Sequence, residues 1–245
     1  MNSFIKVPNE LFEFEMIGKK AKRKYPLKPI DLYVYLYLLS SNFDNSSIKR
    51  KIKTIAERCN VKDNKTIHSS INRLEKLGLV AKKKRHNMFG INVSNAYTVT
   101  QLPGDFFMLD RRYLQFNLGT SAFAVMVYLN RCSNSGFACP SISKISKATG
   151  LSQPTIRAKI SDLQQHLYLA KKYVISQYGD NSNNNYYIHT YAMRKDLLSV
   201  YRKIKSKPKR TIKKFIKQIK PSIRKMLGSF IFFFNRVGKL FPNTS

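Results

Sequence analysis

The spacing of apolar residues along this chain predicts helices followed by short strands. Ile67, Ile71 and Leu74 are separated by three or four residues, which is typical of the buried face of one helix. Strand-like segments follow at residues 79–84 and 97–100. We therefore predict a helix that leads into an antiparallel β-hairpin.

The same pattern recurs further along the chain. Ile156, Ile160 and Leu163 repeat the helical stripe, and strand-like segments follow at residues 169–176 and 186–190. The polar stretch 179–184 between these strands has turn residues and is predicted to form a wing loop. A repeat of roughly 90 to 100 residues matches a small domain, so duplication of a whole domain explains the pattern. The predicted domains are 1–103, which holds the first repeat, 104–192, which holds the second repeat, and a basic amphipathic helical tail at 193–245.

Polar and small residues mark a tight turn in front of each stripe. Asn60 and Gly150 suit a helix C-terminus, because both residue types adopt the left-handed backbone readily. Asp63 or Asn64 suits the start of the next helix in the first repeat, and Ser152 does so in the second repeat. Each repeat is therefore predicted to hold two helices joined by a tight turn.

An apolar helical segment precedes each pair of helices, at residues 32–39 and 122–129. Each repeat also opens on a similar apolar leader, residues 4–7 in the first and residues 106–109 in the second. The fold class expected from these elements is mainly α with small β-hairpin wings, an α+β fold of two tandem winged helix-turn-helix domains and a basic C-terminal helical tail.

The net charge indicates a polyanionic partner. The chain has 45 Lys and Arg against 13 Asp and Glu, a formal net charge of +32. Such a field attracts polyanions, and DNA binding gains further from the release of condensed counterions. Double-stranded DNA is the expected partner, because the major groove of B-form DNA accepts an α-helix and the narrow groove of A-form RNA does not.

Two segments of the second repeat resemble a known family. Residues 135–142 and 150–156 are similar to winged helix-turn-helix domains of phage and plasmid replication proteins. Two such domains in one chain resemble plasmid replication initiators, which implies recognition of repeats at an origin. Transcription regulators share the fold, so a repressor is the alternative function. A nucleoprotein or membrane-tethering structural role is a second alternative.

The first repeat departs from this pattern, because its turn is one residue longer and it lacks the approach found at residues 135–142. We expect a cytoplasmic, DNA-associated protein with self-association or replication proteins as further partners. We also expect the two recognition helices to enter successive major grooves about one helical turn apart.

In the second repeat, residues outside the buried stripe are the candidates for DNA contact. Gln153 and Arg157 are expected to recognise bases, since Gln pairs with adenine and Arg with guanine through two hydrogen bonds. Thr155 and Lys159 are expected to hold phosphates. The candidates in the hairpin are Lys171 and Lys172.

The first repeat offers an equivalent set. Asn72 is expected to contact a base, and Lys65 and Arg73 to contact phosphates. A dense cationic run follows in the hairpin, where a winged helix meets the flanking backbone or the minor groove. Its members are Lys82, Lys83, Lys84 and Arg85. For each candidate, a solvated position on an amphipathic surface is the alternative interpretation.

The C-terminal region resembles neither repeat. Beyond a linker at residues 206–210, apolar residues recur at three- and four-residue steps through residues 212–234, which predicts a basic amphipathic helix. Three uses stay open: packing on the second domain or on another copy, contact with an anionic membrane surface through residues 212–240, and further phosphate contacts. The apolar run at 226–234 is too short to span a bilayer.

The sequence contains no motif of a known catalytic centre. It has no Gly-x-x-x-x-Gly-Lys-Ser/Thr loop for phosphates, and its four histidines form no metal-binding pair. Cys59, Cys132 and Cys139 lack zinc-ligand spacing and are expected to be reduced, mostly buried thiols of a cytoplasmic protein. We therefore expect a non-enzymatic protein without a metal or a cofactor.

Overall fold

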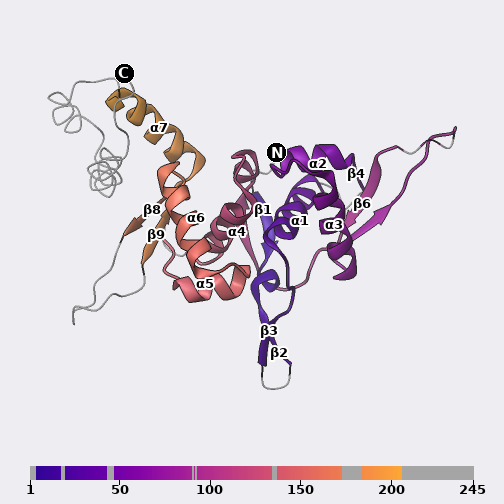
Figure 1. The fold of residues 1–245 in the computed structure, drawn as a ribbon, viewed down its shortest axis with the longest axis horizontal. Helices are drawn as coiled ribbons and strands as arrows, with labels where there is room; N and C mark the ends of the chain where they lie inside the picture. Colours follow the sequence, from indigo (N-terminus) through magenta and orange to yellow (C-terminus); the bar gives the residue numbers. More distant parts are fainter. Residues whose placement is uncertain are drawn as a thin grey trace. The chain divides into compact units, whose positions relative to one another are not determined.

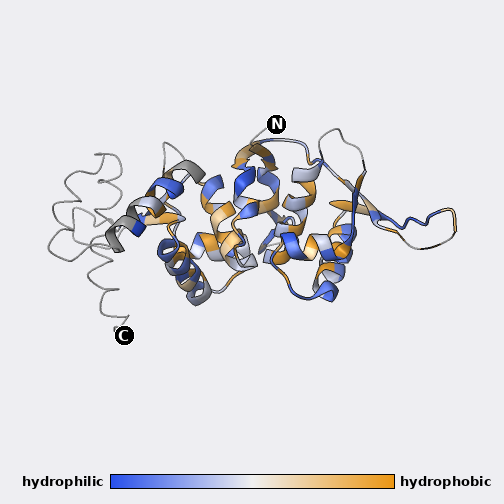
Figure 2. Cartoon of the chain, turned by 90° about the horizontal axis from the view of Figure 1, so that it is seen from above, coloured by the Kyte–Doolittle hydropathy of each residue, from blue (hydrophilic) through white to orange (hydrophobic). Residues whose placement is uncertain are grey.

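The computed structural model describes residues 4–17, 20–42, 47–89, 91, 93–133, 137–172 and 184–205 (Figure 1). Its helices and small antiparallel sheets form a mixed α+β fold, as the sequence predicts. In the hydropathy colouring of Figure 2, helices carry both hydrophilic and hydrophobic residues along their length. Residues 179–183 of the predicted wing loop and the predicted helix at 212–234, with the membrane contact proposed for 212–240, lie outside the described residues.

The chain divides into two compact units. One holds Met1–Cys132 and Ser141–Ile160, and the other holds Ser133–Pro140 and Ser161–Ser245. The first unit therefore contains the first repeat together with the leader and first helices of the second repeat. The domain boundaries expected from the sequence, at 1–103, 104–192 and 193–245, stay predictions.

The first repeat forms three helices and a three-stranded antiparallel sheet with the strand order β4–β6–β5. The predicted order of helix, tight turn, helix and hairpin is confirmed. Strand β4 was not predicted, because three residues are too few to show an alternating pattern. The elements are α1 (Pro29–Ser41), β4 (Ile48–Arg50), α2 (Ile52–Arg58), α3 (Asn64–Lys76), β5 (Val80–Lys83) and β6 (Asn95–Val99).

The turn before α3 has the chemistry that the sequence predicts. Asn60 adopts the left-handed backbone with φ 53°, directly after α2. The carboxylate of Asp63 accepts hydrogen bonds from the backbone N–H groups of Lys65 and Thr66. These bonds satisfy donors that the first turn of a helix leaves unpaired, so they fix the start of α3. They also hold the pKa of Asp63 below its ordinary value.

The second repeat has a similar order of elements. Gly150, with φ 71°, ends the first helix of the pair, and Ser152 Oγ accepts the N–H of Thr155 at 3.4 Å where the next helix starts. An isolated bridge between Ala138 and Tyr186 corresponds to the β4–β6 pairing of the first repeat. The elements are α4 (Thr120–Arg131), α5 (Ile142–Thr149), α6 (Gln153–Gln165), β8 (Leu169–Lys172), β9 (Asn185–Ile188) and α7 (Tyr191–Lys205).

The two similar leaders pair with each other. Strand β1 (Phe4–Pro8) runs antiparallel to β7 (Phe106–Asp110). Helix α1 packs on α4, where Tyr33 stacks on Phe123 with ring centroids 3.9 Å apart. These contacts lie within the first unit and join the two repeats through a common core. The sequence shows that the two leaders are similar, but it does not show that they pair with each other.

A second hairpin precedes α1. Its strands are β2 (Phe14–Ile17) and β3 (Lys20–Arg23), which pair antiparallel. It was not predicted, because every residue of these four-residue strands except Arg23 is exposed, so the strands bury no face that would leave an alternating pattern. Its role in the site depends on Arg23, at the end of β3.

Candidate nucleic-acid interface

The exposed face of α3 lies opposite a buried stripe. Ile67, Ile71 and Leu74 are at most 1% exposed and hold the helix against the core. Residues at steps of three and four on the other side are exposed to solvent. They are Lys65, His68, Ser69, Asn72 and Lys76. Sequence analysis missed Lys76, although its spacing of four residues from Asn72 places it on the same face.

A contact between α3 and β5 brings two predicted residues together. The Nζ atom of Lys82 lies 3.2 Å from Oδ1 of Asn72 and 3.2 Å from a carboxylate oxygen of Glu75. The backbone N–H of Lys82 donates to the other carboxylate oxygen of Glu75 at 3.1 Å. The hairpin is therefore fixed to the helix whose exposed face it borders. Because Glu75 offsets the charge of Lys82, the exposed positive charges lie further along the hairpin.

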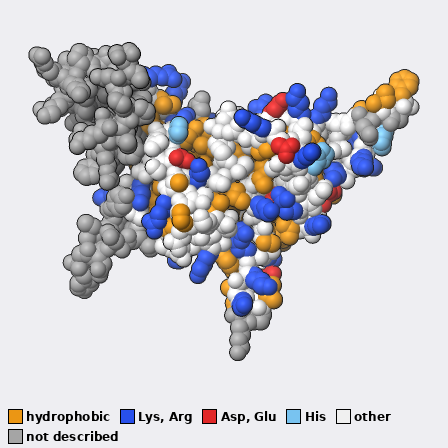
Figure 3. Space-filling model, viewed as in Figure 1, with side chains coloured by type: hydrophobic (Ala, Val, Ile, Leu, Met, Phe, Trp, Pro, Cys, Tyr) orange, Lys and Arg blue, Asp and Glu red, His pale blue; other side chains and the backbone are white. Residues whose placement is uncertain are grey.

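The hairpin carries a cationic arm that begins in β5 and continues past its end, which we name the wing arm (residues 82–87). Lys83 and Lys84 are exposed, and Arg85 is half-buried with Nη1 3.5 Å from Oγ of Ser94. The carbonyl of Arg85 accepts the N–H of Val93 at 3.0 Å, so the two sides stay paired past the end of the sheet. Figures 1 and 3 show the arm extending away from the helices of the first repeat.

The structure changes the interpretation of Arg73. Its Nε and Nη2 atoms lie 2.7 to 3.2 Å from the carboxylate oxygens of Asp31 on α1, and Asp31 is only 1% exposed. These hydrogen bonds raise the pKa of Arg73. The same carboxylate accepts the backbone N–H of Lys28 at 3.0 Å. Arg73 therefore holds α3 against α1 through Nε and Nη2, and its predicted phosphate contact stays a prediction.

In the second repeat the predicted residues lie on α6 and β8. Gln153 and Arg157 are exposed, as a base contact requires. Thr155 is half-buried, and its hydroxyl lies 2.8 Å from the hydroxyl of Ser152, so Thr155 forms part of the cap of α6. Lys159 and Lys171 are half-buried, and Lys172 is exposed. The DNA-contact roles of these residues stay predictions.

A residue that sequence analysis did not indicate supports the turn between α5 and α6. Nη1 of Arg23 donates to the carbonyls of Leu27 at 2.9 Å and of Ala148 at 3.3 Å. A cation at the C-terminus of α5 meets unpaired carbonyls and the negative end of the helix dipole. Burial lowers the pKa of Arg23. A Cβ atom at Gly150 would lie 2.7 Å from Nη2 of Arg23, so the end of the Arg23 side chain would have to shift if this glycine of positive φ were replaced.

Helices α5 and α6, joined by the three-residue turn that begins at Gly150, are the central part of the second repeat. Residues 117–169 match a family model described as a helix-turn-helix domain. The match supports a helix-turn-helix DNA-binding protein and is consistent with DNA as its partner. It includes the α6 candidates Gln153, Thr155, Arg157 and Lys159. A search of curated proteins found no match to the chain.

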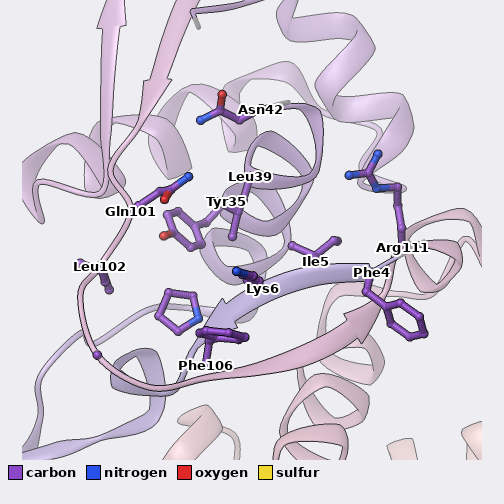
Figure 4. Close-up of a pocket in the computed structure, with 12 residues that line it drawn as sticks. Phe4, Ile5, Lys6, Tyr35, Leu39, Asn42, Gln101, Leu102, Phe106 and Arg111 are labelled. Carbon is purple, nitrogen blue, oxygen red and sulfur yellow. The ribbon is translucent and has the colours of Figure 1, made fainter. Parts of the chain in front are cut away.

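A cleft of about 390 Å³ lies in the first unit, lined by residues that include Tyr35, Asn42 and Arg111 (Figure 4). The Tyr35 hydroxyl donates to the carbonyl of Thr100 at 3.0 Å, and burial raises the pKa of that hydroxyl. On the opposite wall, Nζ of Lys6 lies 4.7 Å from the centroid of the Phe106 ring. These contacts stabilise the walls of the cleft, which is separate from the exposed face of α3.

The thiols differ from one another in exposure. Cys59 is buried, and burial raises its pKa to about 12. Cys132 is half-buried and Cys139 is exposed, so the expectation of mostly buried thiols is wrong for Cys139, which follows the short bridge at Ala138.

Within the described residues, no cluster of His, Cys, Asp and Glu could hold a metal ion. No helix in that part of the chain is long and apolar enough to cross a membrane.

Proposed function

We propose that the chain binds double-stranded DNA sequence-specifically through two tandem winged helix-turn-helix domains, one in each repeat. The observation that carries this proposal is the attachment of the basic hairpin to α3 through Lys82, Asn72 and Glu75. A helix face and a cationic arm that keep fixed positions can contact one duplex at two points. The net charge of +32 adds affinity through counterion release.

In the first repeat, α3 enters the major groove with its exposed face toward the bases. Asn72 lies within that face, and its amide can form two hydrogen bonds with adenine. Lys82 occupies one lone pair of Oδ1 and leaves the second lone pair and the amide N–H groups for the base, so the side chain is oriented before DNA binds. Lys65 and Lys76, at the two ends of the face, contact phosphates.

In the second repeat, α6 enters another major groove. Arg157 pairs with guanine through two hydrogen bonds, and Gln153 contacts adenine at the first turn of the helix. Lys172, exposed on β8, contacts the backbone. Because the exposed residues of α6 differ from those of α3, the two halves of the DNA site have different sequences.

The more specific proposal is that this binding starts replication at origin repeats, in a cytoplasmic, DNA-associated protein. It rests on the resemblance of residues 135–142 and 150–156 to replication proteins. A transcription regulator with the same DNA binding is the alternative. Autonomous replication supported by the gene and its adjacent repeats would favour the initiator. Repression of an adjacent promoter without such replication would favour the regulator.

Footprinting of the full chain on the DNA that flanks its gene, repeated across a salt series, tests the DNA-binding proposal. Protection of spaced repeats with roughly 1000-fold preference over random DNA is expected. Binding that is equal on all sequences and steeply salt-dependent would contradict sequence specificity and favour a nucleoprotein role. Absence of binding at low salt would reject both roles.

A further inference from the structure

Three apolar side chains at the end of the first hairpin are strongly exposed. We name them the wing tip: Met88, Phe89 and Ile91, which are 89%, 78% and 61% exposed, respectively. Figure 3 shows this apolar group at the end of the projecting hairpin. Clustered apolar side chains in water commonly mark a surface that binds something. Because the wing tip lies next to the cationic wing arm, a partner of this hairpin must accept both apolar and cationic groups.

Asn87 makes hydrogen bonds with two residues of the wing tip. Oδ1 of Asn87 accepts the N–H groups of Phe89 at 3.0 Å and of Ile91 at 2.9 Å. The backbone N–H of Asn87 donates to the carbonyl of Ile91 at 2.9 Å. Asn87 therefore closes the turn and holds the apolar side chains beyond the charged residues of the wing arm.

The cations behind the wing tip indicate which partner it meets. Lys83 and Lys84 are exposed on the wing arm, and they attract a phosphate backbone. A duplex offers phosphates at its surface and apolar base faces between adjacent base pairs, which matches a cationic arm that ends in an apolar tip. A bilayer surface is a poorer match, because lipid-binding elements present a long apolar face rather than three side chains at one point.

The length of the wing arm also fits a duplex. From Lys83 to Phe89, an extended chain spans about 20 Å at roughly 3.3 Å per residue. Half a helical turn of B-form DNA is about 17 Å along the axis. With α3 in a major groove and the hairpin fixed to it by Lys82, the wing tip can therefore reach the neighbouring minor groove.

We propose that the wing tip is an apolar wedge that inserts between two base pairs from the minor groove and kinks the bound DNA. This inference rests on the proposed DNA binding and adds a deformation step to it. Phe89 is the inserting side chain, because its flat ring can replace base stacking. Lys83 and Lys84 hold the flanking phosphates. Specificity then depends partly on how easily the flanking base step unstacks.

The test uses the full chain and its selected duplex, with the fluorescent base 2-aminopurine placed in turn at each step beside the α3 half-site. Unstacking at one step is expected to raise the fluorescence by roughly twofold or more. Phe89→Ala is expected to abolish this rise and the bend measured by energy transfer between the DNA ends. Phe89→Leu, which keeps an apolar wedge, is expected to retain part of both signals.

Lys84→Ala is the matched control. It is expected to weaken binding and lower the salt slope by about 1 while it leaves the fluorescence rise on saturated DNA. Specific binding with no fluorescence change at any step, or a bend that Phe89→Ala leaves intact, would overturn the wedge and leave DNA binding standing. Loss of anionic-vesicle binding or of self-association in Phe89→Ala, with unchanged DNA bending, would also overturn it. Absence of any specific site would instead remove the proposed function itself.

Discussion

Helices α3 and α6 pack through equivalent positions and differ on their exposed sides. Their buried residues are Ile67, Ile71 and Leu74 in α3 and Ile156, Ile160 and Leu163 in α6. Outside this stripe, His68 of α3 corresponds to Arg157 of α6, and Asn72 corresponds to Ser161. The inner stripe is constrained by packing, whereas the outer face can diverge without loss of the fold. The comparison therefore predicts one architecture with two different DNA sequences bound.

The way each helix is held also differs. In the first repeat, Arg73 bonds to the buried carboxylate of Asp31 on α1. The corresponding residues of the second repeat are Asp162 and Ala122, so this ion pair has no counterpart there. In the second repeat, Arg23 of β3 instead supports the turn before α6. Each repeat thus has its own long-range contact, and the effect of each contact can be measured with its own substitution.

The largest expected effect is that of Arg73→Ala. Removal of the Arg73 guanidinium leaves the Asp31 carboxylate buried without its counter-charge, which costs about 3 kcal/mol of stability. Urea denaturation followed by circular dichroism measures the loss. Lys76→Ala, on the exposed face of the same helix, is the control and is expected to change stability by about 0.5 kcal/mol or less. Equal effects of the two substitutions would show that the ion pair does not hold α3.

Gly150→Ala is expected to destabilise the second repeat by about 2 to 3 kcal/mol. The left-handed backbone alone costs a non-glycine residue about 1 to 2 kcal/mol, and the new Cβ would displace Arg23 from its carbonyl partners. Gly78→Ala is the matched variant in the first repeat. Its φ is 70°, but no atom lies within 4 Å of the added Cβ, so only the backbone cost is expected. Denaturation midpoints that shift equally would contradict the role of Arg23.

Base recognition is expected to be separable between the helices. Asn72→Ala and Arg157→Ala should each cost about 1 to 3 kcal/mol at one base position, because each removes a pair of hydrogen bonds to one base. Competition binding with single-base variants of the site measures this change. A loss that is uniform over all sequences would make the residue a phosphate contact.

A smaller effect concerns pH. His189 is 2% exposed, and burial lowers its pKa from the ordinary value of 6.5. The unfolded chain therefore binds more protons below that value, so stability is present above pH 6.5 and falls as the pH decreases through it. The first repeat has Val99 at the equivalent position, and a valine side chain does not titrate. Denaturation at several pH values should show the slope, and His189→Gln should remove it. A slope unchanged by that substitution would assign the dependence to another group.

Local features of the fold could be predicted from the sequence. The stripe of Ile67, Ile71 and Leu74 and the caps at Asp63 and Gly150 depend on residues a few positions apart, and the structure confirms them. Spacing alone sets which face of a helix is buried. The helix pair and the wing hairpin of each repeat, and residues on the exposed faces of α3 and α6, could therefore be predicted, whereas the β2–β3 hairpin could not.

Contacts between distant segments could not be predicted. Arg73 and Asp31 are 42 positions apart, and Arg23 and Ala148 are 125 positions apart. Such pairs depend on how α1 and the β2–β3 hairpin pack, which no local pattern encodes. For this reason the contact of Arg73 with Asp31 and the contact of Lys82 with Asn72 were not predicted.

The most direct test of the central claim is selection of binding sites from a randomised duplex library with the full chain, with Asn72→Ala and with Arg157→Ala. We expect a site with two unlike halves about one helical turn apart. Asn72→Ala should relax the sequence of one half, and Arg157→Ala should relax the other. A palindromic site, or two variants that relax the same half, would contradict the claim that α3 and α6 recognise different sequences.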